Sequence, residues 1–270
     1  MIGQDISSGR PGFVRVPGAD VHYMEAGEGS PLLLVHGLAA SWRWWTPVLD
    51  ALTRRHHVYA VDLPGFGLTR ANWWFSLKSA GRFICEVMEA LGLEQADLIG
   101  HSMGGRICMD VAAHCSERVR RLALVSAVGI PWAKSYPEVG WDLLRESRAT
   151  PREYLELVRE DARRVRFFEL ALATYQVLAD DFRDKLAQIQ APTLVVWGGR
   201  DILTPPGFGR VLAAEIPRAE LALIEAAGHN PMWDDPGAFS DLVLSFLAGC
   251  RGAVTERRSD EEIERGGYAA

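Results

Sequence analysis

A serine held between two glycines is the first feature of this sequence that suggests chemistry. It lies in the stretch IGHSMGG, residues 99–105, directly after the apolar run 96–99. If that run is a strand and a helix follows, the chain must turn sharply, and glycine at positions 100 and 104 removes side chains that would collide in the turn. Ser102 is then at the tip in a strained backbone, which is typical of a nucleophile. We therefore expect Ser102 to attack the substrate, with Gly100 and Gly104 shaping its turn.

A serine hydroxyl is a weak nucleophile until a base accepts its proton, and a third group usually orients that base. Of the seven histidines, His229 is the best candidate. It lies in the loop 225–231, after the last predicted strand, at the carboxyl edge where open parallel sheets bind ligands. His36 and His101 flank the same edge but lie in tight turns, which favours a role in backbone packing. We expect His229 to be the base.

The carboxylate that orients the base is predicted to be Asp201. It follows the apolar run 193–197 and a Gly-Gly-Arg turn, again at the carboxyl end of a strand. Asp62 is a rival, but its setting in DLPGFG is typical of a carboxylate that stabilises a turn. The strand that ends at Val125 is followed by SAVGI and offers no carboxylate.

Negative charge that develops on a substrate carbonyl oxygen needs hydrogen-bond donors, and backbone N–H groups are the usual ones. The Met103 N–H lies just after the nucleophile at the start of a predicted helix, where the helix dipole favours an anion. The Leu38 N–H follows the apolar run 31–35, and Gly37 would let this loop approach closely. We expect Leu38 and Met103 to form the oxyanion hole.

The elements that must position these residues alternate along the chain. Two alternating runs, 13–16 and 21–26, predict an antiparallel hairpin. Strands buried on both faces are predicted by six nearly continuous apolar runs: 31–35, 57–61, 96–99, 122–125, 193–197 and 219–224. Helices are predicted over 44–52, 76–91, 103–115, 206–215 and 236–247. The pattern favours an α/β fold: a mainly parallel sheet of the eight-stranded type with helices on both faces.

Residues 131–190 break the alternation, because they carry helix signals and no strand signal. We expect residues 1–130 and 191–250 to form the core domain, 131–190 an inserted helical cap over its carboxyl edge, and 251–270 a flexible tail. Aromatic residues of the cap either line a pocket or, as we expect for each taken alone, pack the small core of the cap: Trp132, Tyr136, Trp141, Tyr154, Phe167, Phe168 and Tyr175. The aromatic cluster 42–45 could likewise line the pocket or anchor its helix.

Composition narrows the class of protein. The 270 residues are 48% hydrophobic and 24% charged, with a formal net charge of −6, which argues against a nucleic-acid partner. No signal-peptide core and no membrane-spanning run is present, so we expect a cytoplasmic protein. The four cysteines have no metal-ligand spacing and are expected to be reduced thiols. We expect neither a metal nor another cofactor, and the oligomeric state is not specified.

The sequence up to about residue 249 resembles the α/β-hydrolase family. The resemblance is carried, in the expected order, by HGLA (36–39), DLPGFG (62–67), GHSMGG (100–105), WGGRD (197–201) and GHNP (228–231). It implies a Ser-His-Asp hydrolase without a cofactor and with a helical cap between the sixth and seventh strands. Serine at position 102 differs from the aspartate nucleophile of haloalkane dehalogenases and epoxide hydrolases. The single glycine at position 37 departs from the multi-glycine oxyanion loop of hormone-sensitive-lipase-like esterases.

The predicted function is that of a serine esterase, resembling carboxylesterases and lipases. It would cleave a small or medium, largely apolar carboxylic ester with water through an acyl-enzyme. Hydrolysis of a carbon–carbon bond in a vinylogous diketone is the enzymatic alternative, and thioester or lactone cleavage and peracid formation are others. A ligand-binding protein that keeps the fold without turnover is the non-enzymatic alternative.

Overall fold

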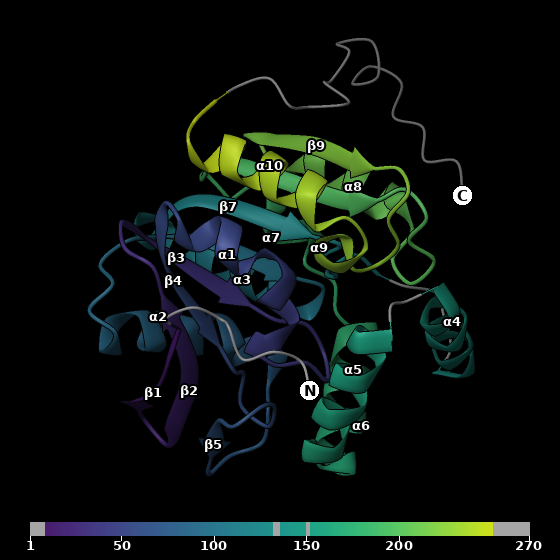
Figure 1. The fold of residues 1–270 in the computed structure, drawn as a ribbon, viewed down its shortest axis with the longest axis horizontal. Coiled ribbons are helices and arrows are strands. Elements are labelled where there is room, and N and C mark those ends of the chain that lie inside the picture. Colours follow the sequence, from purple (N-terminus) through teal and green to yellow (C-terminus); the bar gives the residue numbers. More distant parts are fainter. Residues whose placement is uncertain (1–8, 132–135, 150–151, 251–270) are drawn as a thin grey trace.

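A mixed sheet with helices on both faces forms the body of the protein (Figure 1). The computed structural model describes residues 9–131, 136–149 and 152–250. The strand order is β1-β2-β4-β3-β6-β7-β8-β9, and β5 also pairs with β2. Strand β2 is antiparallel to its three partners β1, β4 and β5, and all other neighbouring strands are parallel. The strands are β1 (Arg10–Val16), β2 (Ala19–Ala26), β3 (Ser30–Val35), β4 (His56–Val61), β5 (Arg70–Ala71), β6 (Ala96–His101), β7 (Val119–Val125), β8 (Thr193–Gly198) and β9 (Ala219–Ile224).

The helices follow the strands along the chain. The α-helices are α1 (Thr46–Thr53), α2 (Leu77–Ala90), α3 (Met103–His114), α4 (Tyr136–Ala149), α5 (Arg152–Arg164), α6 (Phe167–Leu178), α7 (Arg183–Leu186), α8 (Pro206–Glu215), α9 (Pro231–Asp234) and α10 (Pro236–Leu247). Two short 3₁₀-helices are η1 (Trp42–Trp45) and η2 (Ser116–Arg118).

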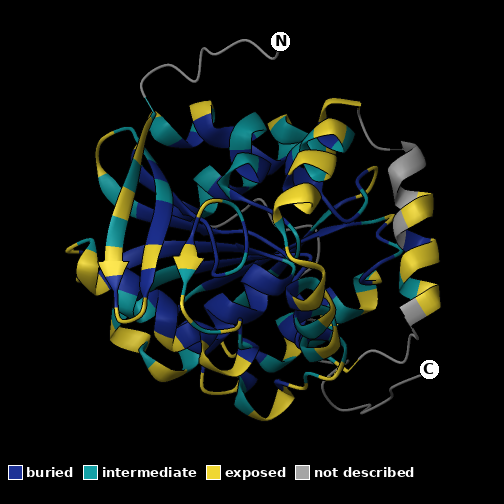
Figure 2. Ribbon diagram, turned by 90° about the horizontal axis from the view of Figure 1, so that it is seen from below, coloured by how far each residue is buried: buried dark blue, intermediate teal, exposed yellow. Residues whose placement is uncertain are grey.

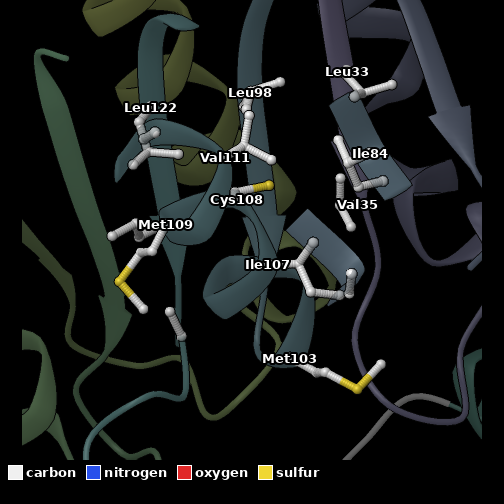
Figure 3. Close-up of a cluster of buried hydrophobic side chains, with 14 of the residues drawn as sticks. Leu33, Val35, Ile84, Leu98, Met103, Ile107, Cys108, Met109, Val111 and Leu122 are labelled. Carbon is white, nitrogen blue, oxygen red and sulfur yellow. The ribbon is translucent and has the colours of Figure 1, made fainter. Parts of the chain in front are cut away.

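Alternate residues of each central strand enter two different hydrophobic cores. Leu33 and Val35 of β3 pack in the core that α2, α3 and α8 cover, whereas Leu32 and Leu34 pack in the core under α1 and α10. All four side chains are fully buried. A strand with both faces covered must be apolar at every position, which explains the continuous apolar runs in the sequence. Figure 2 shows the buried strands between partly exposed helices, and Figure 3 shows the first core, where Ile84 and Ile107 pack near β3 and β6.

Helix α2 illustrates why the covering helices form where they do. Its apolar residues recur every three or four positions, so one stripe faces the sheet. The residues buried in this stripe are Leu77, Ala80, Gly81, Phe83, Ile84, Val87 and Met88. Lys78 and Arg82 lie on the exposed side.

The observed fold confirms the predicted fold class. The hairpin and all six predicted buried strands are present, and the five predicted helices agree with the observed ones within a few residues, except that the first begins as η1 before α1. The short elements β5, η2, α7 and α9 were not predicted. They span two to four residues each, too few for a hydrophobic period to show. With β5, the sheet has nine strands rather than eight.

Helices α4 to α7 are the described part of the segment between β7 and β8 (Figure 1). Helix α5 is joined to the loop after β3 by the carboxylate of Asp161, which is fully buried. Asp161 Oδ2 accepts hydrogen bonds from Ser41 Oγ at 2.8 Å and Trp44 Nε1 at 3.1 Å, and Oδ1 accepts one from Arg43 at 2.5 Å. The division into core and cap domains stays a prediction, and the predicted tail lies outside the described residues.

Among residues 9–131, 136–149 and 152–250, no helix is long and apolar enough to span a membrane. The four cysteines are free thiols, as expected: Cys85, Cys108, Cys115 and Cys250.

The crossing of α3 over β3 gives the first testable prediction. A Cβ added at Gly104 would lie 2.2 Å from the Val35 carbonyl oxygen and 2.5 Å from that of His36, both backbone atoms that cannot move aside. Gly104→Ala should therefore lower the free energy of unfolding by at least about 2 kcal/mol in urea denaturation. Gly207→Ala in α8 is the matched control, because nothing lies within 4 Å of its new Cβ. Equal stability of the two variants would contradict the close crossing.

Attachment of α5 gives the second prediction. Asp161→Ala removes a buried partner of Arg43 and should cost about 3–5 kcal/mol in the same assay. Glu160 is the control, since its Oε2 lies 2.6 Å from the same guanidinium but its side chain is 54% exposed. Glu160→Ala should leave the urea midpoint unchanged, because water screens an exposed pair. Similar losses in both variants would show that Asp161 does not anchor the helix.

Candidate functional site

Ser102 occupies a strained backbone position at the junction of β6 and α3. Its φ of 53° and ψ of −116° lie in a region that residues other than glycine rarely adopt. The neighbouring strand β7 and the loop after it hold Ser102 there: Ser102 N donates to the Val125 carbonyl at 2.9 Å, and Val128 N donates to the Ser102 carbonyl at 3.2 Å. A Cβ at Gly100 would lie 2.5 Å from the Gly104 carbonyl oxygen, so the turn requires its glycines. The residue is half-buried rather than sealed in the core.

The structure brings His229 and Asp201 together. His229 Nδ1 lies 2.9 Å from Asp201 Oδ2, and the two residues are 7% and 3% exposed. They come from the loops after β9 and β8. Burial alone would raise the pKa of Asp201, but the charge and hydrogen bond of His229, together with hydrogen bonds from Thr204, outweigh it and hold that pKa below its usual range. Asp201 is therefore a carboxylate at neutral pH, suited to orient the imidazole.

The loop that follows β3 lies against Ser102. A Cβ at Gly37 would be 3.2 Å from the Ser102 Cβ and 3.0 Å from His101 Nδ1. His36 fixes the loop: its Nε2 accepts from Leu63 N at 3.0 Å, so its Nδ1 carries the proton and donates to the Gly37 carbonyl at 2.7 Å. Burial lowers the pKa of His36, which keeps this neutral form.

The two predicted oxyanion donors lie on either side of this contact. Leu38 follows Gly37 and is half-buried, and Met103 follows Ser102 as the first residue of α3. Ala39 has a φ of 56°, so this loop also carries backbone strain beside the serine.

His101 is a buried support of His229. Its Nε2 lies 3.0 Å from the His229 carbonyl oxygen, and its ring packs between the rings of His229 and Trp44, at centroid distances of 5.0 and 5.9 Å. Burial, then the charge of His229, lowers the pKa of His101 to about 3. A neutral imidazole facing a carbonyl must donate, so His101 holds the backbone of His229, in line with the packing role that its tight turn predicts.

Asp62, the alternative acid, accepts hydrogen bonds from the backbone of the segments around it. Its Oδ1 accepts from Trp42 N at 2.8 Å, and its Oδ2 accepts from Leu68 N at 2.9 Å. His22 Nδ1 lies 2.8 Å from the same Oδ2. These contacts agree with the interpretation of Asp62 as a turn-stabilising carboxylate.

Sequence reasoning missed Thr204 and Asp234. Thr204 donates twice to the Asp201 carboxylate, and Asp234 Oδ2 accepts from Gly228 N at 2.8 Å, next to His229. The spacing Asp201-x-x-Thr204 is a local signal that could have found the first, because an aspartate often accepts from the backbone three residues later. No comparable signal marks Asp234, whose partner lies six residues before it.

Aromatic residues near the site mostly pack rather than stand open. Trp44 and Trp45 are buried, and the ring of Tyr154 in α5 packs against those of Trp44 and Trp233, at centroid distances of 5.1 and 5.0 Å.

The expected packing is wrong for four aromatic residues of the predicted cap, which are 58–86% exposed: Trp141, Phe167, Phe168 and Tyr175. In α6 the inward stripe is Glu169, Ala173 and Val177, which leaves three of these rings on the outer faces of that helix. Trp132 and the side chain of Tyr136 lie outside the described residues.

No group of three or more His, Cys, Asp or Glu side chains that could hold a metal occurs within the part of the chain that the structure describes. The arrangement offers a half-buried serine at the end of β6, a buried imidazole–carboxylate pair and backbone N–H groups. These are the components of acyl transfer through a serine.

The chain is similar in sequence and in fold to known hydrolases. The chain is 30% identical over 255 residues to the 2-hydroxymuconate semialdehyde hydrolase of Pseudomonas sp. (strain CF600), covering 83% of this chain and 89% of the relative. It is 27% identical over 248 residues to the pimeloyl-[acyl-carrier protein] methyl ester esterase of Nitrosomonas europaea, covering 82% and 97%. A crystal structure of a hydrolase from Pseudomonas aeruginosa PA01 superposes with a TM-score of 0.77 and 27% identity, covering 89% of this chain and 99% of the other.

The model of the alpha/beta hydrolase fold family matches residues 30–167 and 169–236, which include every residue discussed as a catalytic candidate. With this match over more than half of its length, the chain belongs to the alpha/beta hydrolase fold family and is a hydrolase.

Proposed function

We propose that this hydrolase is a serine esterase that cleaves a small or medium, largely apolar carboxylic ester through an acyl-enzyme. The observation that carries the proposal is the buried His229–Asp201 hydrogen bond at 2.9 Å. The pair follows β9 and β8, and Ser102 follows β6 in the same parallel part of the sheet. All three residues therefore belong to the carboxyl edge.

In this mechanism the Ser102 Oγ attacks the ester carbonyl while His229 accepts the hydroxyl proton. The imidazolium that forms is stabilised by Asp201, which stays ionised because its pKa is held low. His229 then gives the proton to the departing alcohol, leaving the acyl group on Ser102. A water molecule, deprotonated by the same imidazole, hydrolyses the acyl-enzyme and restores the serine.

The N–H groups of Leu38 and Met103 would receive the charge on the carbonyl oxygen. Gly37 lies against Ser102, which brings the first donor near the reacting carbon, and the start of α3 supplies the second. Loss of one such donor costs about 3 kcal/mol of transition-state stabilisation in a comparable enzyme.

Two lines support an ester as substrate. One relative is named a methyl ester esterase, and Leu38, which follows Gly37 in the loop against Ser102, is apolar and only half-buried. The second candidate is hydrolysis of a carbon–carbon bond, favoured by the relative named 2-hydroxymuconate semialdehyde hydrolase. Thioester, lactone and peracid chemistry would use the same three residues, whereas a ligand-binding protein would not turn over.

Labelling of Ser102 separates these functions. We expect a fluorophosphonate probe to label the wild type and Ser102→Ala to lose both labelling and turnover of p-nitrophenyl esters, by at least about 10⁴-fold, without loss of folding. Labelling without turnover of any ester would favour the carbon–carbon hydrolase. Absence of labelling would favour the binding protein. Substantial activity in Ser102→Ala would show that the nucleophile is another residue.

The acid is tested by a pair of amide variants. Asp201→Asn should slow ester turnover by about 10⁴-fold, as in a serine protease, because the amide favours the wrong imidazole tautomer. Asp62→Asn is the control. Asp62 follows β4, which β3, β6 and β7 separate from β8, and its carboxylate accepts from the backbone N–H groups of Trp42 and Leu68. Turnover is compared only after circular dichroism shows that both variants fold. A larger loss of turnover in Asp62→Asn would reverse the assignment.

A further inference from the structure

The Asp201 carboxylate is held on both of its oxygens by one residue, Thr204. The Thr204 N–H donates to Asp201 Oδ1 at 2.8 Å, and the Thr204 hydroxyl donates to Oδ2 at 2.7 Å. Thr204 is fully buried. Two donors from one residue fix the plane of the carboxylate as well as its position, which a single hydrogen bond would not do.

Thr204 is itself held in place by a hydrogen bond from Trp197 in β8, the strand that precedes its loop. Its carbonyl accepts a hydrogen bond at 2.7 Å from the indole N–H of Trp197, a fully buried residue of β8. Pro205 follows and begins α8 as its N-cap. The Asp201 carboxylate is therefore oriented from the sheet core, through Trp197 and Thr204, as well as by His229.

The Thr204 hydroxyl also lies beside the imidazole. Its Oγ1 is 3.2 Å from His229 Nδ1 and 3.4 Å from the Ser126 carbonyl oxygen. A hydroxyl has one proton, and the shortest contact is the one to Asp201 Oδ2. With that proton given to the carboxylate, the lone pairs of Oγ1 face Nδ1, so His229 can keep its own proton only at Nδ1, directed at Asp201. The opposite nitrogen, Nε2, is then the basic one.

We propose that Thr204 is a positioning residue that locks the Asp201 carboxylate, and through it the tautomer and ring orientation of His229. This inference rests on the proposed roles of Asp201 and His229. Thr204 contacts the imidazole at Nδ1, whereas the proposed proton acceptor is Nε2, so Thr204 acts through Asp201 and His229. Its effect belongs to the chemical step, so it should change kcat rather than KM.

Thr204→Val tests the proposal, because valine keeps the branched shape of threonine and replaces its hydroxyl with a methyl group. We expect kcat for a p-nitrophenyl ester to fall about 10–100-fold, by analogy with the effect of removing groups that orient metal-binding side chains, with KM changed less than about threefold. Thr204→Ser should restore kcat to within about threefold of the wild type. Thr193→Val is the matched control: this buried threonine of β8 also loses one hydrogen bond, from its hydroxyl to the Ala191 carbonyl.

A second readout does not depend on turnover. The proton shared between His229 Nδ1 and Asp201 should give a far-downfield proton NMR line that His229→Gln removes. We expect Thr204→Val to shift this line or make its exchange with water faster, and Thr204→Ser and Thr193→Val to leave it as in the wild type. An unchanged line in Thr204→Val overturns the proposal even if the protein proves not to be an esterase.

Further outcomes bear on the proposed role of Thr204. A kcat within twofold of the wild type in Thr204→Val overturns the proposal while leaving the esterase assignment intact. An equal fall in Thr204→Val and Thr193→Val, or no recovery in Thr204→Ser, shows a general packing effect and overturns it too. If Ser102→Ala keeps its activity, the proposed function fails, and the NMR line alone decides the role of Thr204.

Discussion

Backbone hydrogen bonds that continue the parallel ladder past the strand ends hold the site in register. Ser102 N donates to the last carbonyl of β7, Ser126 N donates to the Val196 carbonyl of β8, and Gly199 N donates to the last carbonyl of β9. The loops after β6, β7 and β8 are thus each tied to the neighbouring strand before they diverge. Ser102 and Ser126 both have positive φ, at 53° and 44°, and this strain persists because the ladder and the two cores overdetermine it. These bonds fix the backbone from which the following side chains project. A hydroxyl, an imidazole and a carboxylate from distant segments can therefore lie at one edge of the sheet.

Burial and hydrogen bonds together set the protonation states of the ionisable groups at this edge. His36 and His101 are fully buried, and burial lowers the pKa of both, so they serve as neutral donors to carbonyls. Asp201 takes the opposite course: His229 and Thr204 hold its pKa down despite burial. A neutral imidazole in the support of His229 avoids a second positive charge beside the proposed base. The contrast shows why three histidines at one edge do not compete for the same task.

The strands and the residues at their ends could be predicted from the sequence, whereas the contacts between side chains far apart in the chain could not. Continuous apolar runs with glycine turns indicated the buried strands, and the position of Ser102, Asp201 and His229 after three of them indicated which edge they share. Side-chain partners far apart in the chain leave no such pattern: nothing around Asp161 marks it as the partner of Ser41 and Trp44, more than 100 residues earlier. The exposed rings of α6 were mispredicted for a related reason, because the face that a short helix buries depends on its neighbours.

Helix α5 is connected to His229, the proposed base, through a short series of packed rings. Asp161 holds the Trp44 indole, Trp44 packs on His101, and His101 packs on His229 while donating to its carbonyl. Tyr154 adds a second contact from α5 to Trp44. The polar part of this series depends on one buried carboxylate, whose loss would leave the Trp44 N–H and Arg43 without their partner in the interior. Movement of α5 would therefore alter the packing of Trp44, and through it that of His101, beside the His229 imidazole.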